Sequence, residues 1–185
     1  MGRVRFCATC GAPVELRVPE GDERARHVCS ACGQVHYVNP RVVVGAVCAW
    51  EGRLLLCRRA IDPRRGLWTL PAGFLEQGET TAEGARREAW EEARARIDVQ
   101  DVLAVYDLPH ISQVQVFFRA PLVAPDVAAG PESLEVGLFA WEDVPWADLA
   151  FPTVAWALRY YHATRDQPRL APDVRVQDGG GAARP

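Results

Sequence analysis

The chain has 185 residues, of which 49% are apolar, so it can bury one full core and still leave room for a small second module. Its net charge of −3 does not favour the basic face that non-specific nucleic-acid binding needs. The longest apolar run, Val42 to Trp50, is too short to cross a bilayer, and no secretory apolar run follows Met1. The sequence therefore predicts a soluble, cytoplasmic protein with no membrane partner.

Three zones differ in composition. Residues 1–38 hold four of the six cysteines, residues 39–162 carry the strand and helix patterns, and residues 163–185 are rich in Pro, Gly, Ala and charge. Such a tail cannot bury enough apolar surface to fold by itself. We predict a small N-terminal module, one main domain and a mostly disordered tail with these boundaries.

The first zone contains two C-x2-C pairs, Cys7 with Cys10 and Cys29 with Cys32, separated by 18 residues. This spacing is typical of a four-thiolate zinc ribbon, in which the closed tetrahedral shell is structural. Disulfides or free thiols are the alternatives, and an intracellular location disfavours disulfides. Two nearby histidines could replace a ligand, but four cysteines suffice, and the two remaining cysteines fit strand cores; these residues are His27, His36, Cys48 and Cys57.

The second zone shows strand and helix patterns without a regular βαβ rhythm. We therefore predict an α/β fold with a mixed sheet and helices on both faces. Pro152 falls inside the last expected helix as a possible break. The expected strands are 42–50 and 53–57, joined as a hairpin, then 102–108, 114–120 and 138–141, and the expected helices are 80–96 and 147–162.

Three carboxylates, Glu88, Glu91 and Glu92, share one face of the first expected helix. They repel one another unless a hard divalent cation lies between them, and Mg²⁺ is the usual ion beside a phosphate substrate. A solvated helix with i,i+4 ion pairs, such as Arg87 with Glu91, explains the periodicity equally simply. The residues of the loop before the helix favour the metal-binding interpretation over the solvated helix.

The chain resembles the Nudix family, whose motif has the form G-x5-E-x7-R-E-U-x-E-E-x-G-U, where U is a bulky aliphatic residue. The first glycine of the motif and all of its charged residues are present in register in this chain: Gly73, Glu79, Arg87, Glu88, Glu91 and Glu92. Arg94 stands where the motif has its last glycine, and Ala89 and Ala95 replace aliphatic residues. The glycine normally ends the helix, so Arg94 leaves the end of the helix uncertain by about one turn.

The resemblance implies an α/β/α sandwich preceded by the zinc ribbon, and it implies roles for particular residues. Glu88, Glu91 and Glu92 would bind Mg²⁺ (or Mn²⁺) with the backbone carbonyl of Ala72. Arg87 would orient the carboxylates by ion pairing, while Glu79 would support the geometry of the loop and the helix.

Several further residues carry weaker expectations from the same resemblance. Glu135 is the first candidate for an additional acid at the metals or as a base, with Glu132 second, and an exposed loop acid is the alternative for both. Arg59 matches a position that can contact phosphate, or it is a solvated arginine at a strand end. Tyr106, Phe117 and Phe118 could stack on a base, although aromatic residues in strands more often belong to the core.

Residues 1 to about 165 are similar to the branch of the family that contains FAD and ADP-ribose pyrophosphatases. The implied activity is Mg²⁺-dependent cleavage of FAD to AMP and FMN, or of ADP-ribose to AMP and ribose 5-phosphate, with a small nucleotide as the only implied ligand. NADH pyrophosphatase activity and a non-catalytic nucleotide sensor are the alternatives. The NADH enzymes carry a Gln-Pro-Trp-Pro-Phe-Pro type motif that residues 108–113 lack. A homodimer with the ribbon at its contact is left open.

Overall fold

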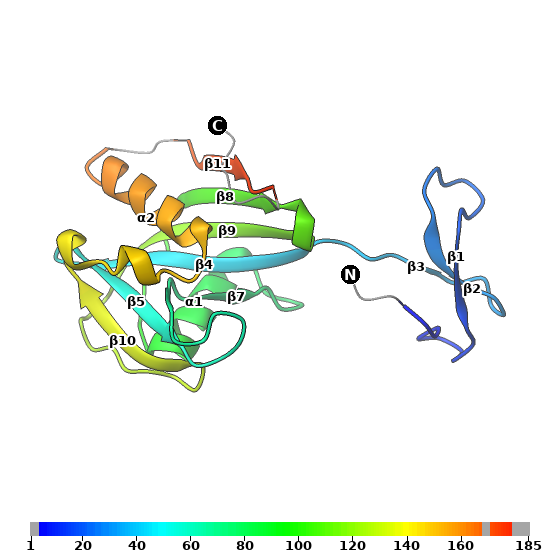
Figure 1. Cartoon of the computed structure of the whole chain (residues 1–185), viewed down its shortest axis with the longest axis horizontal. Coiled ribbons are helices and arrows are strands. Elements are labelled where there is room, and N and C mark those ends of the chain that lie inside the picture. The colour runs from blue at the N-terminus through cyan, green and yellow to red at the C-terminus, as the bar shows by residue number, and fades with distance from the viewer. Residues whose placement is uncertain (1–3, 168–170, 179–185) are drawn as a thin grey trace. The chain divides into compact units, whose positions relative to one another are not determined.

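The computed structural model of the protein describes residues 4–167 and 171–178. The chain divides into two compact units, Met1–Pro40 and Arg41–Pro185, and each is described here by itself (Figure 1). In the described part, neither helix combines the length and apolar character needed to span a bilayer.

The first unit is a small antiparallel sheet of β1 (Val14–Arg17), β2 (Arg26–Cys29) and β3 (Val35–His36). Among its described residues only Cys7, Val28 and Cys29 are fully buried. Three residues cannot supply the apolar area that keeps forty residues folded. This unit therefore depends on something other than a hydrophobic core.

The second unit is built on a mixed sheet, which confirms the predicted fold class. Its strand order is β10-β5-β4-β9-β8-β11, with β6 beside β5 and β7 beside β4. Two pairs, β4 with β9 and β8 with β11, are parallel, and the other pairs are antiparallel. The strands are β4 (Arg41–Trp50), β5 (Arg53–Arg59), β6 (Trp68–Thr69), β7 (Ala72–Phe74), β8 (Val102–Leu108), β9 (Gln113–Pro121), β10 (Ser133–Phe139) and β11 (Asp173–Val176).

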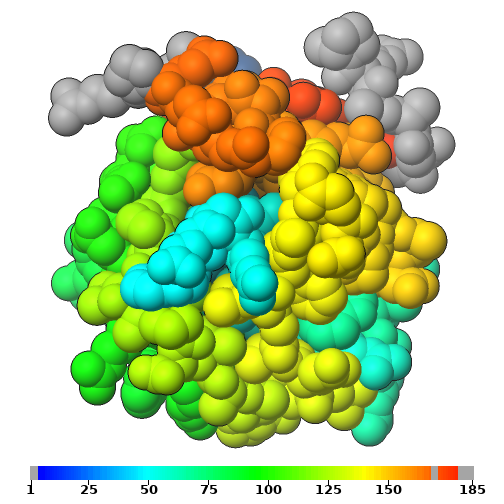
Figure 2. All heavy atoms as spheres, turned by 90° about the vertical axis from the view of Figure 1, so that its left-hand side faces the viewer, coloured from blue at the N-terminus to red at the C-terminus, as the bar shows by residue number. Residues whose placement is uncertain are grey.

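One helix packs on each face of this sheet (Figure 1). The small residues of α1 (Thr81–Ala93) form a cluster with Ala46, Cys48 and Cys57, so both of these cysteines are core residues as expected. On the other face, α2 (Pro152–Thr164) packs against the cluster around Tyr106. Successive side chains of the central strands thus point alternately toward the two faces of the sheet and pack into the core on each face. Figure 2 shows α2 in orange above the hairpin turn between β4 and β5 in cyan.

Both helices are shorter than predicted, for local reasons. α1 ends at Ala93 rather than at Arg96, because Arg94 adopts a left-handed conformation with φ 52° and its N–H binds the carbonyls of Ala89 and Trp90. Arg94 therefore ends the helix in the conformation usual for a glycine. α2 begins at Pro152 rather than at residue 147, because proline lacks an N–H and fits the first turn of a helix.

The tail contains one strand that its composition did not predict. β11 pairs in parallel with β8, and Asp173 accepts a hydrogen bond of 3.0 Å from the hydroxyl of Tyr106. At the next turn, Nδ1 of His110 lies 2.9 Å from the carbonyl oxygen of Gln177. Alternating Val174 and Val176 suit an edge strand once a partner edge is present. Residues 168–170 and 179–185 of the predicted disordered tail lie outside the described residues.

The left-handed conformation of Arg94 leads to a prediction about stability. Glycine adopts this conformation without the steric penalty of a Cβ atom. We therefore expect Arg94→Gly to raise the free energy of unfolding by about 0.5 kcal/mol, because the relieved strain exceeds the added freedom of the unfolded chain. Urea denaturation would measure the change. Arg96→Gly, an exposed position without positive φ, should not stabilise the protein, and equal stabilisation at both positions would contradict the explanation.

Candidate active site

The four cysteines of the first unit meet in one cluster. Their Sγ atoms all lie within 4.8 Å of one another, with Cys10 3.4 Å from Cys29 and Cys7 3.7 Å from Cys32. The N–H of Cys32 donates to Sγ of Cys29, which lowers the pKa of that thiol. Gly11 and Gly33 follow the two knuckles with positive φ, where any other residue would be strained. Four soft thiolates in a closed shell are the donor set that zinc prefers.

In the second unit, the loop before α1 is joined to the helix by reciprocal caps. Thr80 is the N-cap, and its hydroxyl accepts from the N–H of Glu83 while the carboxylate of Glu83 accepts from the N–H of Thr80. Upstream, Glu79 accepts from the N–H of Glu76 at 2.8 Å. These contacts fix where the first turn of the helix begins.

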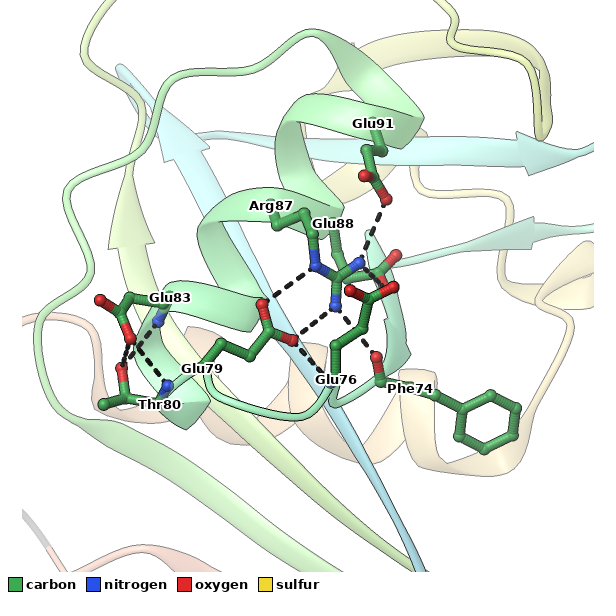
Figure 3. A network of polar contacts seen from close by, with 8 residues as sticks. All are labelled: Phe74, Glu76, Glu79, Thr80, Glu83, Arg87, Glu88 and Glu91. Atoms are coloured by element: carbon green, nitrogen blue, oxygen red, sulfur yellow. Dashed lines mark hydrogen bonds and ion pairs between the residues drawn. The ribbon is translucent and has the colours of Figure 1, made fainter.

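Arg87 joins this loop to the carboxylates of the helix (Figure 3). Its guanidinium donates two hydrogen bonds to Glu79, at 2.7 and 3.1 Å, and a third to the carbonyl of Phe74. It also donates to Glu88 at 2.6 Å and to Glu91 at 3.1 Å. The bonds from Arg87 hold the pKa of Glu79 down to about 2, so Glu79 stays ionised. The planar fork of arginine is what allows these contacts at once.

The predicted metal-binding carboxylates differ in their surroundings. Glu88 and Glu92 are only 8% and 6% exposed, whereas Glu91 is exposed. Burial raises the pKa of Glu88, and it raises that of Glu92 to about 8 even though the N–H of Ala72 donates to Glu92 at 3.2 Å. Gly73 permits this packing, because a Cβ atom there would collide with the carboxylate of Glu88. Two buried carboxylates with raised pKa values form a site that a divalent cation would neutralise.

All three carboxylates and Ala72 line one cavity of about 940 Å³. This volume lies near the upper end of the range for small-molecule sites, so a ligand of dinucleotide size can enter. Hard oxygen donors on one wall of an open cavity suit Mg²⁺ or Mn²⁺, which retain open positions for water and phosphate. The donor chemistry therefore fits the predicted ion.

The two candidates for an additional acid lie in different surroundings. Glu135 is exposed, forms an ion pair of 3.5 Å with Arg58, and is not among the described residues that line the cavity. Glu132 does line the cavity, and its charge contributes to the raised pKa values of Glu88 and Glu92 after the larger effect of burial. Glu132 immediately precedes β10, whose register shifts between Ser133 and Glu135, and alternation in the sequence does not reveal such an irregularity.

The remaining candidates lie in different places. Arg59 lines the cavity, with its guanidinium 5.3 Å from the centre of the Phe151 ring and its Nε bonded to the carbonyl of Pro63. Phe117 lines the cavity while belonging to the core. Tyr106 and Phe118 are core residues and are not among the described lining residues.

Several lining residues come from segments that the sequence did not single out. They include Thr69 of β6, residues 150–154 at the start of α2, and Gln177 beyond β11. Pro152 was noted only as a possible break, yet a proline that starts a helix also signals that free N–H groups follow it. The other segments carry no local signal, since only the folded sheet brings them to the cavity.

Comparisons with known proteins agree with this geometry. A zinc-ribbon model described as "Nudix N-terminal" matches residues 5–38, and a model described as "NUDIX domain" matches residues 39–163. The structure is similar to a crystal structure of a NUDIX hydrolase from Nitrosomonas europaea, with a TM-score of 0.88 and 48% identity over 94% of this chain and 100% of that one.

Two curated relatives illustrate the range of names among similar proteins. An "NAD-capped RNA hydrolase NudC" from Chromobacterium violaceum is 30% identical over 161 residues, which cover 85% of this chain and 56% of the relative. An "ADP-ribose pyrophosphatase" from Methanocaldococcus jannaschii is 30% identical over 115 residues, which cover 59% of this chain and 67% of the relative. The chain thus spans little more than half of the first relative. The ribbon match and the cysteine cluster together make zinc the structural metal of the first unit.

Removal of zinc should unfold the first unit and leave the second intact, because the ribbon has almost no core. We expect Cys7→Ser to lose the zinc that wild-type protein retains through gel filtration, and to expose residues 4–40 to limited proteolysis. Ser30→Ala, between the cysteines of the second pair, is the control and should keep the metal. Full protection of this segment in zinc-free protein would refute a metal-dependent fold.

Arg87→Lys should weaken the junction of loop and helix, because an ammonium group cannot reproduce the fork that reaches Glu79, Glu88 and Glu91 together. We expect the free energy of unfolding to fall by about 2 kcal/mol, which urea denaturation would measure. Arg86→Lys, at an exposed neighbouring position, should leave it unchanged. Equal stability of the two variants would show that charge alone suffices at position 87.

Proposed function

Because this chain belongs to the Nudix family, we propose that it is a Mg²⁺- or Mn²⁺-dependent hydrolase that cleaves the pyrophosphate bond of a nucleoside diphosphate linked to a second group. The observation that carries this proposal is the arrangement of Glu88, Glu91 and Glu92 on one wall of a cavity large enough for a dinucleotide. Arg87 holds two of these carboxylates in place, so the site is preorganised.

The reaction is the attack of water on one phosphorus, with cleavage of the bond to the bridging oxygen and release of two monophosphates and a proton. When bound, the divalent ion supplies charge neutralisation at the phosphoryl oxygens and lowers the pKa of water. Glu88, Glu91 and Glu92 would hold it with the carbonyl of Ala72. We assign Glu132 to the proton of the attacking water, because it lines the same cavity and its charge acts on the buried carboxylates of Glu88 and Glu92.

ADP-ribose and FAD are the substrates that we propose first. Both place a pyrophosphate between an adenosine and a second bulky group, which the cavity volume accommodates. A relative named for ADP-ribose supports the former, and the resemblance of residues 1 to about 165 to the branch with FAD and ADP-ribose pyrophosphatases supports both. FAD would yield AMP and FMN, and ADP-ribose would yield AMP and ribose 5-phosphate.

An NAD-type substrate is the second candidate, since the similarity to the NudC relative covers 85% of the chain. Against it, residues 108–113 lack the proline- and aromatic-rich motif of NADH pyrophosphatases. The structure has a short 3₁₀ turn there, Pro109–Ile111, that lines the cavity with His110 and Ile111. The shape of this wall would therefore decide between the two substrate classes.

Purified protein with Mg²⁺ should hydrolyse at least one of ADP-ribose, FAD, NADH and NAD-capped RNA, with AMP or the capped fragment's monophosphate resolved by chromatography. Glu91→Gln should lower kcat by about 100-fold, because it removes one anionic oxygen donor from the metal. The matched control is Glu83→Gln on the same helix, since glutamine also serves in a capping box.

The outcomes separate the competing functions. Full activity of Glu91→Gln would refute the assignment of the carboxylates. Tight nucleotide binding without turnover of any substrate, with either Mg²⁺ or Mn²⁺, would identify a nucleotide-sensing module instead.

A further inference from the structure

The part of the cavity wall that β9 forms is neutral, unlike the part that carries the carboxylates. Gln113, Gln115 and Phe117 alternate along this strand, and all three line the cavity. Because alternate residues of a strand point to the same face of the sheet, the two amides are neighbours on that face. The charged members of the described lining residues come from other segments, such as α1 and the loop before it. The β9 wall therefore suits a neutral polar group of the substrate better than a phosphate.

One atom of this wall is buried without a partner. The side-chain oxygen of Gln115, Oε1, is buried and accepts no hydrogen bond from any of the described residues, 4–167 and 171–178. A buried acceptor that is left unpaired costs free energy, so folded proteins seldom retain one that neither water nor a ligand satisfies. Since Gln115 lines the cavity, a ligand that enters the cavity can supply the missing donor.

A third amide reaches the cavity from the C-terminal tail. Gln177 directly follows β11 and lines the cavity. Its N–H donates to the carbonyl of Asp107 on β8 at 2.8 Å, and its own carbonyl oxygen lies 2.9 Å from Nδ1 of His110. Leu108, the next residue of β8, is the cross-strand partner of Gln113. The pairing of the tail therefore holds Gln177 beside the end of β8, whose other neighbour is β9.

Phe74 connects this wall to the carboxylates of α1. Its carbonyl accepts from Arg87, while its ring points away from that network (Figure 3). Val43 on β4 is the cross-strand partner of both Phe74 and Gln115, and all three residues line the cavity. Phe74 and Gln115 are therefore separated by two strand spacings, about 10 Å. A nucleotide whose phosphates lie at the carboxylates can thus place its base against β9.

We infer that Gln115, with Gln113 and Gln177 in the same cavity, recognises the edge of the substrate's base and selects adenine. The exocyclic amine of adenine would donate to Oε1 of Gln115, and the amide N–H of Gln115 would donate to a neighbouring ring nitrogen, as glutamine does with adenine in nucleic-acid recognition. Hypoxanthine has an oxygen in place of this amine, so it would leave two acceptors facing each other. This inference rests on the proposed function, since the base is that of the proposed adenosine-containing substrates.

The test measures the binding of AMP and of IMP to the full chain with Mg²⁺ by titration calorimetry. The two nucleotides differ only in the base, and neither has a pyrophosphate bond to hydrolyse. We expect wild type to bind AMP about ten-fold more tightly than IMP, because IMP leaves Oε1 of Gln115 unpaired. Gln115→Leu and Gln115→Met remove the acceptor with little change of volume, and each variant should bind the two nucleotides with Kd values within two-fold of each other.

The stability of these variants distinguishes recognition of a ligand from a structural role. Because Oε1 of Gln115 has no partner in the free protein, an apolar side chain at this position removes a buried unpaired acceptor. Both variants should therefore unfold at a urea concentration no lower than that of wild type, and a lower midpoint in both would identify a structural amide and overturn the inference. Gln100→Leu, at an exposed position outside the described lining residues, is the control and should keep the preference for AMP.

The binding results also separate this inference from the proposed function. Equal binding of AMP and IMP by wild type, a preference for AMP that both Gln115 variants retain, an equal loss of preference in Gln100→Leu, or no binding of AMP by wild type would each overturn the base site. Hydrolysis of ADP-ribose or FAD together with equal binding of AMP and IMP would reject the base site alone. A preference for AMP that disappears in both Gln115 variants, in a protein that hydrolyses no substrate, would support the base site and reject the hydrolase.

Discussion

The rest of the site depends on the hydrogen bonds that the guanidinium of Arg87 donates. One planar group joins the loop, through Glu79 and the carbonyl of Phe74, to the helix, through Glu88 and Glu91. Without it the neighbouring carboxylates would repel each other and turn toward water. Because the loop continues from β7, the same contact holds the strand in which Ala72 donates to Glu92.

Both helices contribute residues to the lining of the cavity. α1 presents carboxylates, and their burial opposes ionisation unless a cation is bound. The first turn of α2 also contributes lining residues, and the guanidinium of Arg59 lies 5.3 Å from the centre of the ring of its N-cap residue, Phe151.

The ribbon and the main domain are stabilised by different interactions. With only three fully buried residues described, it gains little from the hydrophobic effect, and four thiolates around one zinc ion provide the missing stability. The second unit instead buries two apolar clusters, one on each face of its sheet. The two units therefore fold by independent means, and loss of the metal should be felt locally.

The sequence by itself determined the features that depend on short spacing: the cysteine knuckles, the helix that carries Glu88, Glu91 and Glu92, and the β4–β5 hairpin. These patterns suffice because their geometry repeats within a few residues. It did not determine that Glu132 lines the cavity while Glu135 is not among the described lining residues. Nor did it predict that β11 pairs with β8 or that Thr153 lines the cavity. Only the tertiary structure decided these, because each depends on pairing between segments far apart in the chain, and no local pattern encodes which edge or cavity such a segment will meet.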